Sequence, residues 1–309
     1  MAAEVECIAG DREALFFAVG CLRLMAAMAV TSAATPLRVG LVCGCAATLL
    51  GCAVMWSMGA PRNYVVLNGA SLLLACGVMA WKPARTLALS RPLAPIAFGL
   101  VMLATALFGV EVDDTARWLV LGPLRLQPSL VLVPMMVVIL AARPTRAASL
   151  GVCLAALALA LQADVALSTA VLMALLPLIL RRRSSTLLIW LVATWAAAVH
   201  RASSSADAPF VDGIVAMAFG SSVFQGTLLC AGLAALIVPA LWFRREDGAQ
   251  TSTALASFGC FWGGLAVASL LCHGGAPLVS FGGSAVLGYF LSLGSLPVPE
   301  PRTPAIEDT

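Results

Sequence analysis

The acid in this sequence with the clearest capacity for chemistry is Asp212, which lies at the start of an apolar run. That run continues without a charged residue to Phe243. A carboxylate at the centre of a bilayer costs about 3 kcal/mol on insertion scales. At the rim of a water-filled cavity the same group stays hydrated and can accept a proton. We therefore expect Asp212 to be the reactive group of a membrane-embedded site, and the alternative is that it caps the helix that follows.

The elements that position this acid are expected to be membrane-spanning helices. Of the 309 residues, 61% are hydrophobic and only 11% are charged, which is too few charges to cover a soluble domain of this size. The basic residues are scattered between apolar runs, so no nucleic-acid-binding patch is expected. Cysteines and histidines show no metal-ligand spacing, and we expect no metal site built from them. The predicted fold class is all-α, a polytopic helical membrane protein.

Apolar runs long enough to span a bilayer divide the chain into three parts. Residues 1–35 contain an acidic leader and an apolar segment, 13–34, that either spans the membrane or lies in its interface. Residues 36–297 are expected to form one transmembrane domain, and 298–309 a disordered, proline-rich cytoplasmic tail. The ten expected core spans are 37–58, 63–81, 92–110, 128–142, 147–162, 164–180, 186–200, 213–243, 252–272 and 277–296.

The loops between these spans alternate in their content of basic residues. The basic loops are 82–91, 143–146, 181–183 and 244–245. The positive-inside rule makes these loops cytoplasmic. The opposite ends of the spans, which carry Asp212 and most of the other polar residues with chemical capacity, are therefore expected to face outwards.

The run from Gly213 to Phe243 is too long for one straight span. Its roughly 31 residues would rise about 46 Å as a helix, more than a bilayer requires. We expect this run to tilt strongly or to break, and Gly220-Ser221-Ser222 is the natural place for a break. A break would let the first turns after Asp212 line a cavity instead of facing lipid.

Four stretches along residues 37–296 resemble, in order, the motifs of the SEDS family (shape, elongation, division and sporulation; the FtsW and RodA type). The family has Gly-x-Glu-x-Asn-Gly-Ala-Arg-Arg-Trp, Leu-Gly and Gln-Pro-Ser in one external loop. It has Gln-Pro-Asp before another span, Thr-Asp before the catalytic helix, and Ser-Tyr-Gly-Gly-Ser at the last span. The matching positions here are Gly109, Glu111, Ala116, Arg117, Trp118, Leu121, Gly122, Gln127, Pro128, Ser129, Gln162, Asp164, Asp212, Ile214, Ala216, Gly226, Pro277, Ser280, Gly282, Gly283 and Ser284.

The resemblance implies a SEDS-type bundle of ten core helices, to which the N-terminal membrane-associated helix is added. It implies a peptidoglycan glycosyltransferase that polymerises lipid II, an undecaprenyl-linked disaccharide-peptide, in cell division or cell-shape maintenance. Such a protein works at the outer face of the bacterial cytoplasmic membrane, as a multi-pass protein. The implied partners are lipid II, membrane lipids and a class B penicillin-binding protein, and a divalent cation stays open as a cofactor.

The resemblance also implies roles for individual residues. Asp212 matches the family's catalytic aspartate and would take the proton from the acceptor sugar hydroxyl. Arg117 would bind near the leaving diphosphate. The remaining expected substrate-binding residues are Trp118, Gln127, Ser280, Gly282, Gly283 and Ser284. For Arg117 and Trp118 the alternative is an interfacial anchor. For Gly282-Gly283 it is close helix packing. Asp164 is expected to cap a helix.

The chain departs from the family pattern just before Asp212. Only about eleven residues, 201–211, separate this aspartate from the preceding span, where the family has several tens. Phe210 and Val211 replace the family's His-Thr. These departures motivate an alternative function, a catalytically silent relative that acts as a scaffold or binds lipid II for a penicillin-binding protein.

Overall fold

The computed structural model describes residues 36–81, 91–112, 115–121, 124–202, 210–241, 248–271 and 275–297. The expected N-terminal leader, its apolar segment and the expected tail after residue 297 lie outside these ranges.

The described chain is mostly helical. Its helices, in order, are α2 (Pro36–Ser57), α3 (Arg62–Ala80), α5 (Ala94–Phe108), α6 (Pro128–Ala142), α7 (Arg146–Leu161), α8 (Val165–Arg182), α9 (Ser185–Arg201), α10 (Ile214–Ser221), α11 (Val223–Ala235), α12 (Val238–Leu241), α13 (Ala249–Leu271) and α14 (Gly283–Gly294).

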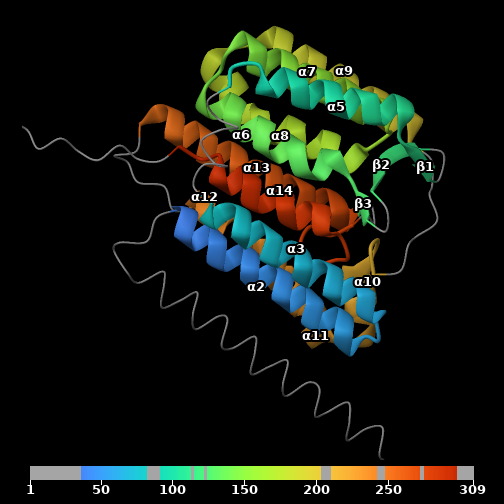
Figure 1. The fold of residues 1–309 in the computed structure, drawn as a ribbon. Helices are drawn as coiled ribbons and strands as arrows, with labels where there is room; N and C mark the ends of the chain where they lie inside the picture. The colour runs from blue at the N-terminus through green and yellow to red at the C-terminus, as the bar shows by residue number, and fades with distance from the viewer. Residues whose placement is uncertain are drawn as a thin grey trace, which may run out of the picture.

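The long helices form a bundle of successive layers (Figure 1). Helices α5, α7 and α9 pack together on one side, and α2, α3 and α11 on the other. Between them lie α6, α8, α13 and α14, with α13 against α8 and α14 against both α6 and α3. Helix α14 is therefore central, and the chain that leads into it is surrounded by the ends of several helices.

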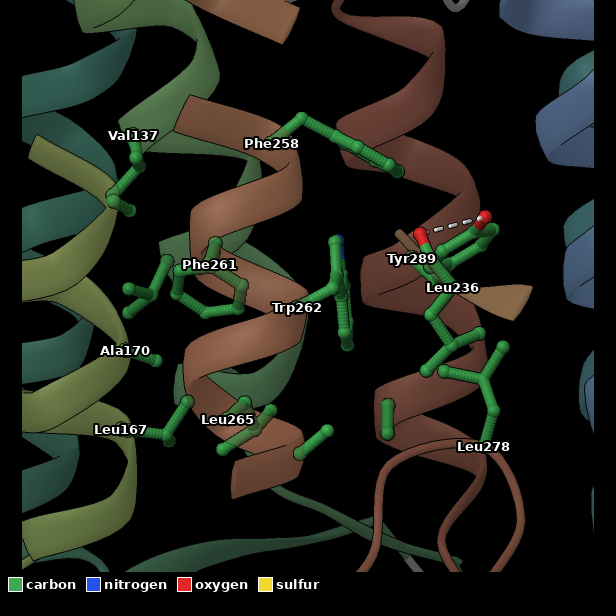
Figure 2. Packing of buried hydrophobic residues seen from close by; sticks show 14 of the residues in the cluster. Val137, Leu167, Ala170, Leu236, Phe258, Phe261, Trp262, Leu265, Leu278 and Tyr289 are labelled. Atoms are coloured by element: carbon green, nitrogen blue, oxygen red, sulfur yellow. Dashed lines mark hydrogen bonds between the residues drawn. The ribbon is translucent and has the colours of Figure 1, made fainter. Parts of the chain in front are cut away.

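Aromatic side chains of α13 and α14 form the middle of the core (Figure 2). Trp262 and Tyr289 meet edge to face with their ring centroids 5.2 Å apart, and both are fully buried. The indole N–H of Trp262 donates to Ser292 Oγ at 3.2 Å, so its polar atom is satisfied inside the bundle. This packing fixes α14 against α13 inside the bundle.

Most of the expected spans coincide with helices to within a few residues, and α6 matches its expected range of 128–142. By length and composition, the described part of the chain has 4 helices able to cross a membrane, α2, α3, α8 and α13. Five shorter apolar helices accompany them, α5, α6, α7, α11 and α14. The expected count of ten spans is thus not confirmed.

The expected break in the long apolar run is confirmed. Helix α10 ends at Ser221, and α11 begins at Val223. Ser222 between them is extended, with φ −159° and ψ 135°, and its hydroxyl accepts a hydrogen bond from the Phe224 N–H at 3.2 Å. Serine in this conformation caps the new helix, which is the physical reason why the break falls there. A second interruption after Ala235 separates the short helix α12.

The expectation of an all-α fold needs a correction. Three short strands, β1 (Val110–Val112), β2 (Thr115–Leu121) and β3 (Leu124–Leu126), form an antiparallel sheet in the order β1-β2-β3. Trp118 in β2 lies opposite Val110 in β1. These strands contain several β-branched and aromatic residues, which favour strands where a segment does not pack as a helix.

Basic and polar residues occupy opposite ends of the same helices. Helix α6 starts directly after Gln127 and ends before Arg143, and α8 starts after Asp164 and ends at Arg182. The strands and the start of α10 lie at the end of the bundle that carries Gln127 and Asp164 (Figure 1). The positive-inside rule predicts that this polar end is the outer one, and this orientation stays a prediction.

Candidate functional site

Asp212 follows a turn at residues 210–211 at the polar end and lies just before α10. It forms an antiparallel bridge with Gly275, and the Phe281 N–H donates to the Phe210 carbonyl at 2.9 Å. The segment 210–212 is therefore held along the chain that leads into α14. The N-cap of α10 is Gly213, so Asp212 lies one residue outside the capping position.

The backbone around Asp212 has unusual geometry. Phe210 and Gly213 both have left-handed backbone angles, with φ 62° and 63°, and so does Leu278 in the facing segment, with φ 63°. A bulky residue such as Phe210 rarely adopts this region, because its side chain clashes with its own backbone. Strain of this kind persists only where surrounding contacts enforce it, and it is common at functional sites.

The segment 280–284, which contains four of the residues expected to bind substrate, is tied to α3. The side chain of Asn68 donates to the Ser280 carbonyl at 2.9 Å and accepts from the Gly282 N–H at 3.1 Å. A Cβ added to Gly283 would collide with Ser71 of α3. The expected alternative for this glycine, close helix packing, is therefore confirmed, and its contact with substrate stays a prediction.

Gln127 joins the last helix to the start of α8. Its backbone N–H donates to Ser284 Oγ at 3.0 Å, and its side-chain Nε2 donates to Asp164 Oδ2 at 3.3 Å. Asp164 Oδ1 accepts from the Leu167 N–H at 3.0 Å, which confirms the expected helix cap. All three side chains are buried.

Arg117 and Gln162 connect the sheet to the turn between α7 and α8. The guanidinium of Arg117 donates through Nε to the Gln162 carbonyl at 3.0 Å and through Nη2 to the Ala163 carbonyl at 3.3 Å. Gln162 Nε2 donates to the Ala116 carbonyl at 3.1 Å. Two of the five N–H groups of Arg117 are thus used by the backbone, and the others can bind an anion.

The structure thus brings the predicted residues to one end of the bundle through a chain of contacts. From Asp212 the chain passes to the 275–284 segment, then through Gln127 to Asp164, and then to the turn that Arg117 binds. Trp118, half-buried on β2, is the neighbour of Arg117 in the sheet.

A hollow of about 270 Å³ opens beside Asp212. Its walls come from the first turns of α10, from α11 and α13, and from the chain before α14. The lining residues are Gly213, Ile214, Val215, Ala216, Phe219, Cys230, Ser269, Leu270 and Ala276. The hollow is therefore almost wholly apolar.

The described residues include no group of three or more histidine, cysteine, aspartate or glutamate side chains close enough to hold a metal ion. At the site, both carboxylate oxygens of Asp164 already accept hydrogen bonds.

Asn68 and Tyr64 are residues of the site that sequence reasoning missed. Tyr64 stacks on Phe281 with ring centroids 3.9 Å apart and an interplanar angle of 13°. The signal for Asn68 was available: a lone amide in an apolar span is costly unless it is paired, and such residues often mark functional regions. Nothing local pointed to its partner, which lies more than 200 residues further along the chain.

Comparison with known proteins identifies the fold. No protein-family model matches the chain, and no curated protein does. Crystal structures of the rod shape determining protein RodA from Thermus thermophilus, as the unmutated protein and as a mutant with an aspartate changed to alanine, match with a TM-score of 0.55 and 22% sequence identity. Each match covers 82% of this chain, and 94% of the mutant or 93% of the unmutated RodA chain.

The fold and the apolar helices define a multi-pass helical membrane protein. Its architecture is that of RodA, a SEDS protein, so the resemblance seen in the sequence is confirmed for the fold.

Proposed function

We propose that this protein is a peptidoglycan glycosyltransferase of the SEDS type, which polymerises lipid II at the outer face of the bacterial cytoplasmic membrane. The observation that carries the proposal is the pairing of Asp212 with Gly275 at the polar end of a RodA-like fold. This pairing holds the backbone of Asp212 beside an apolar hollow and next to the chain that leads into the last helix.

In this proposal Asp212 is the general base. Its carboxylate accepts the proton of the acceptor sugar hydroxyl as that oxygen forms a bond to the donor sugar, and the bond between the donor sugar and its diphosphate breaks. Proton transfer to a positioned base contributes about 10²–10⁴-fold to a rate. The diphosphate leaves with negative charge, and the remaining N–H groups of Arg117 supply hydrogen bonds to it.

The other proposed contacts surround this reaction. Trp118 offers an aromatic surface at the level of the headgroups. Gln127, Ser280, Gly282, Gly283 and Ser284 shape the wall of the site and orient the sugars. A class B penicillin-binding protein is the proposed partner, which crosslinks the glycan that this protein makes.

The experiment supplies purified protein with lipid II in detergent, alone and with candidate class B penicillin-binding proteins, and separates the glycan products by size. The wild type is expected to extend glycan chains, and Asp212→Asn is expected to stop extension while the melting temperature of the protein stays unchanged. Full activity of Asp212→Asn would exclude this aspartate as the base. A wild type that is inert with every partner would exclude polymerase function.

Two observations favour a second candidate function, a catalytically silent scaffold or lipid II-binding protein. Only ten residues, 202–211, lie between the end of α9 and Asp212. In addition, Arg117 donates to two backbone carbonyls and so has a structural role that needs no substrate. Cells carrying Asp212→Asn that grow and shape their wall normally, while deletion cells do not, would favour the scaffold.

A further inference from the structure

One face of α3 contacts four successive residues before and at the start of α14. Tyr64, Asn68 and Ser71 are spaced by four and three residues, which puts them on a single helix face. Tyr64 stacks on Phe281, Asn68 binds Ser280 and Gly282, and Ser71 meets Gly283. One face of α3 thus contacts every residue of the segment 280–283, although the two lie more than 200 residues apart in the chain.

Asn68 is the polar centre of this face. It is fully buried, and both ends of its amide are used: Nδ2 donates to the Ser280 carbonyl at 2.9 Å, and Oδ1 accepts from the Gly282 N–H at 3.1 Å. An aliphatic residue would fill the space but would leave these two backbone groups without partners. The amide therefore fixes the positions of the two peptide groups that flank Phe281.

Phe281 in turn holds the segment that carries Asp212. Its N–H donates to the Phe210 carbonyl at 2.9 Å, and Phe210 has the left-handed φ of 62°. The bridge between Asp212 and Gly275 lies two residues further on. Asn68 and Asp212 are therefore linked by a short path of backbone hydrogen bonds, through Phe281 and Phe210.

We propose that Asn68 is a positioning residue that fixes the location of Asp212 at the rim of the site. Asn68 acts through Phe281 and Phe210 and does not contact substrate. The catalytic meaning of this inference rests on the proposed function, because it takes Asp212 as the base, whereas the mechanical link can be measured without any reaction.

The mechanical link is tested first. In the wild type, the amides of Phe281 and Gly282 are expected to resist hydrogen exchange as strongly as amides inside α14. Asn68→Leu is expected to speed exchange at these two amides at least tenfold. In the Asp212→Cys background, Asn68→Leu is also expected to change severalfold the rate at which a water-soluble thiol reagent labels position 212, measured by mass on that peptide.

Leu72→Ala is the matched control. Leu72 is buried one turn further along α3 and makes none of these contacts. Its substitution is expected to lower stability without changing exchange at Phe281 or labelling at position 212. Unprotected wild-type amides, or equal effects of Asn68→Leu and Leu72→Ala on exchange and labelling, would overturn the link.

The catalytic role is tested with lipid II. A misplacement of a catalytic group by about 1 Å costs about 10²-fold in rate. We therefore expect Asn68→Leu to reduce kcat by about that factor while KM changes little, and Leu72→Ala to retain kcat. Altered labelling at position 212 with an unchanged kcat would overturn the positioning role. An inert wild type would instead defeat the proposed function, and exchange and labelling alone would then decide the link between Asn68 and position 212.

Discussion

The side-chain amide of Gln127 donates a hydrogen bond to Asp164, with 3.3 Å between Nε2 and Oδ2. The same residue binds Ser284 Oγ through its backbone N–H at 3.0 Å. Gln127 therefore joins the start of α6 to the starts of α8 and α14, the central helix of the bundle. Because Gln127 and Asp164 are both buried, the contact is shielded from competing water.

Gln127→Ala is expected to destabilise the protein by about 1–3 kcal/mol, since it leaves a buried carboxylate oxygen without its partner. Thermal unfolding in detergent measures the effect. Gln250→Ala, at an exposed glutamine in the first turn of α13, is the control and should change stability little. Equal effects of the two substitutions would show that the contact with Asp164 is energetically irrelevant.

A second prediction concerns the contact between α14 and α6 at Gly288. A Cβ at this position would collide with the backbone carbonyl of Leu130, which cannot move aside as a side-chain end could. Gly288→Ala is therefore expected to cost about 1–3 kcal/mol of unfolding free energy through overpacking. The measurement is the unfolding midpoint in denaturant.

Gly69 provides the matched control for this prediction. It lies within α3, and a Cβ there would meet no atom within 4 Å. Gly69→Ala should therefore stabilise the protein by about 0.4–1 kcal/mol, because alanine loses less backbone entropy in a helix. A Gly288→Ala variant as stable as the wild type would contradict this close approach of α14 to α6.

A third prediction concerns orientation in the membrane, on which the proposed function depends. Asn63 and Ser185 are both exposed, at the first turns of α3 and α9, and these turns lie at opposite ends of the bundle. In intact cells, a membrane-impermeant thiol reagent should label Asn63→Cys above the level of the parent protein. Ser185→Cys, next to the arginines that end α8, should be labelled only after permeabilisation.

The reverse labelling pattern would put Asp212 on the cytoplasmic side. In that case the site could not meet a sugar acceptor outside the cell, and the polymerase proposal would be excluded together with the external scaffold.

The sequence by itself determined the features that depend on local composition. The apolar run 128–142 became α6 because its length and lack of charge leave no other way to satisfy its backbone in lipid. The break at Ser222 followed from excess length and from a serine able to cap the next helix. The cap at Asp164 followed from an acid placed directly before an apolar run.

Only the tertiary structure decided which of these elements meet. The sheet of β1, β2 and β3 forms where an all-helical fold was expected, because pairing between neighbouring short strands satisfies backbone groups that no helix uses. The partners of Asn68 lie more than 200 residues away, and hydropathy does not encode which face of α3 turns towards α14. Packing decides which face of α3 contacts the start of α14. Gly283, which has no Cβ, fits closely against Ser71, and Tyr64 stacks on Phe281.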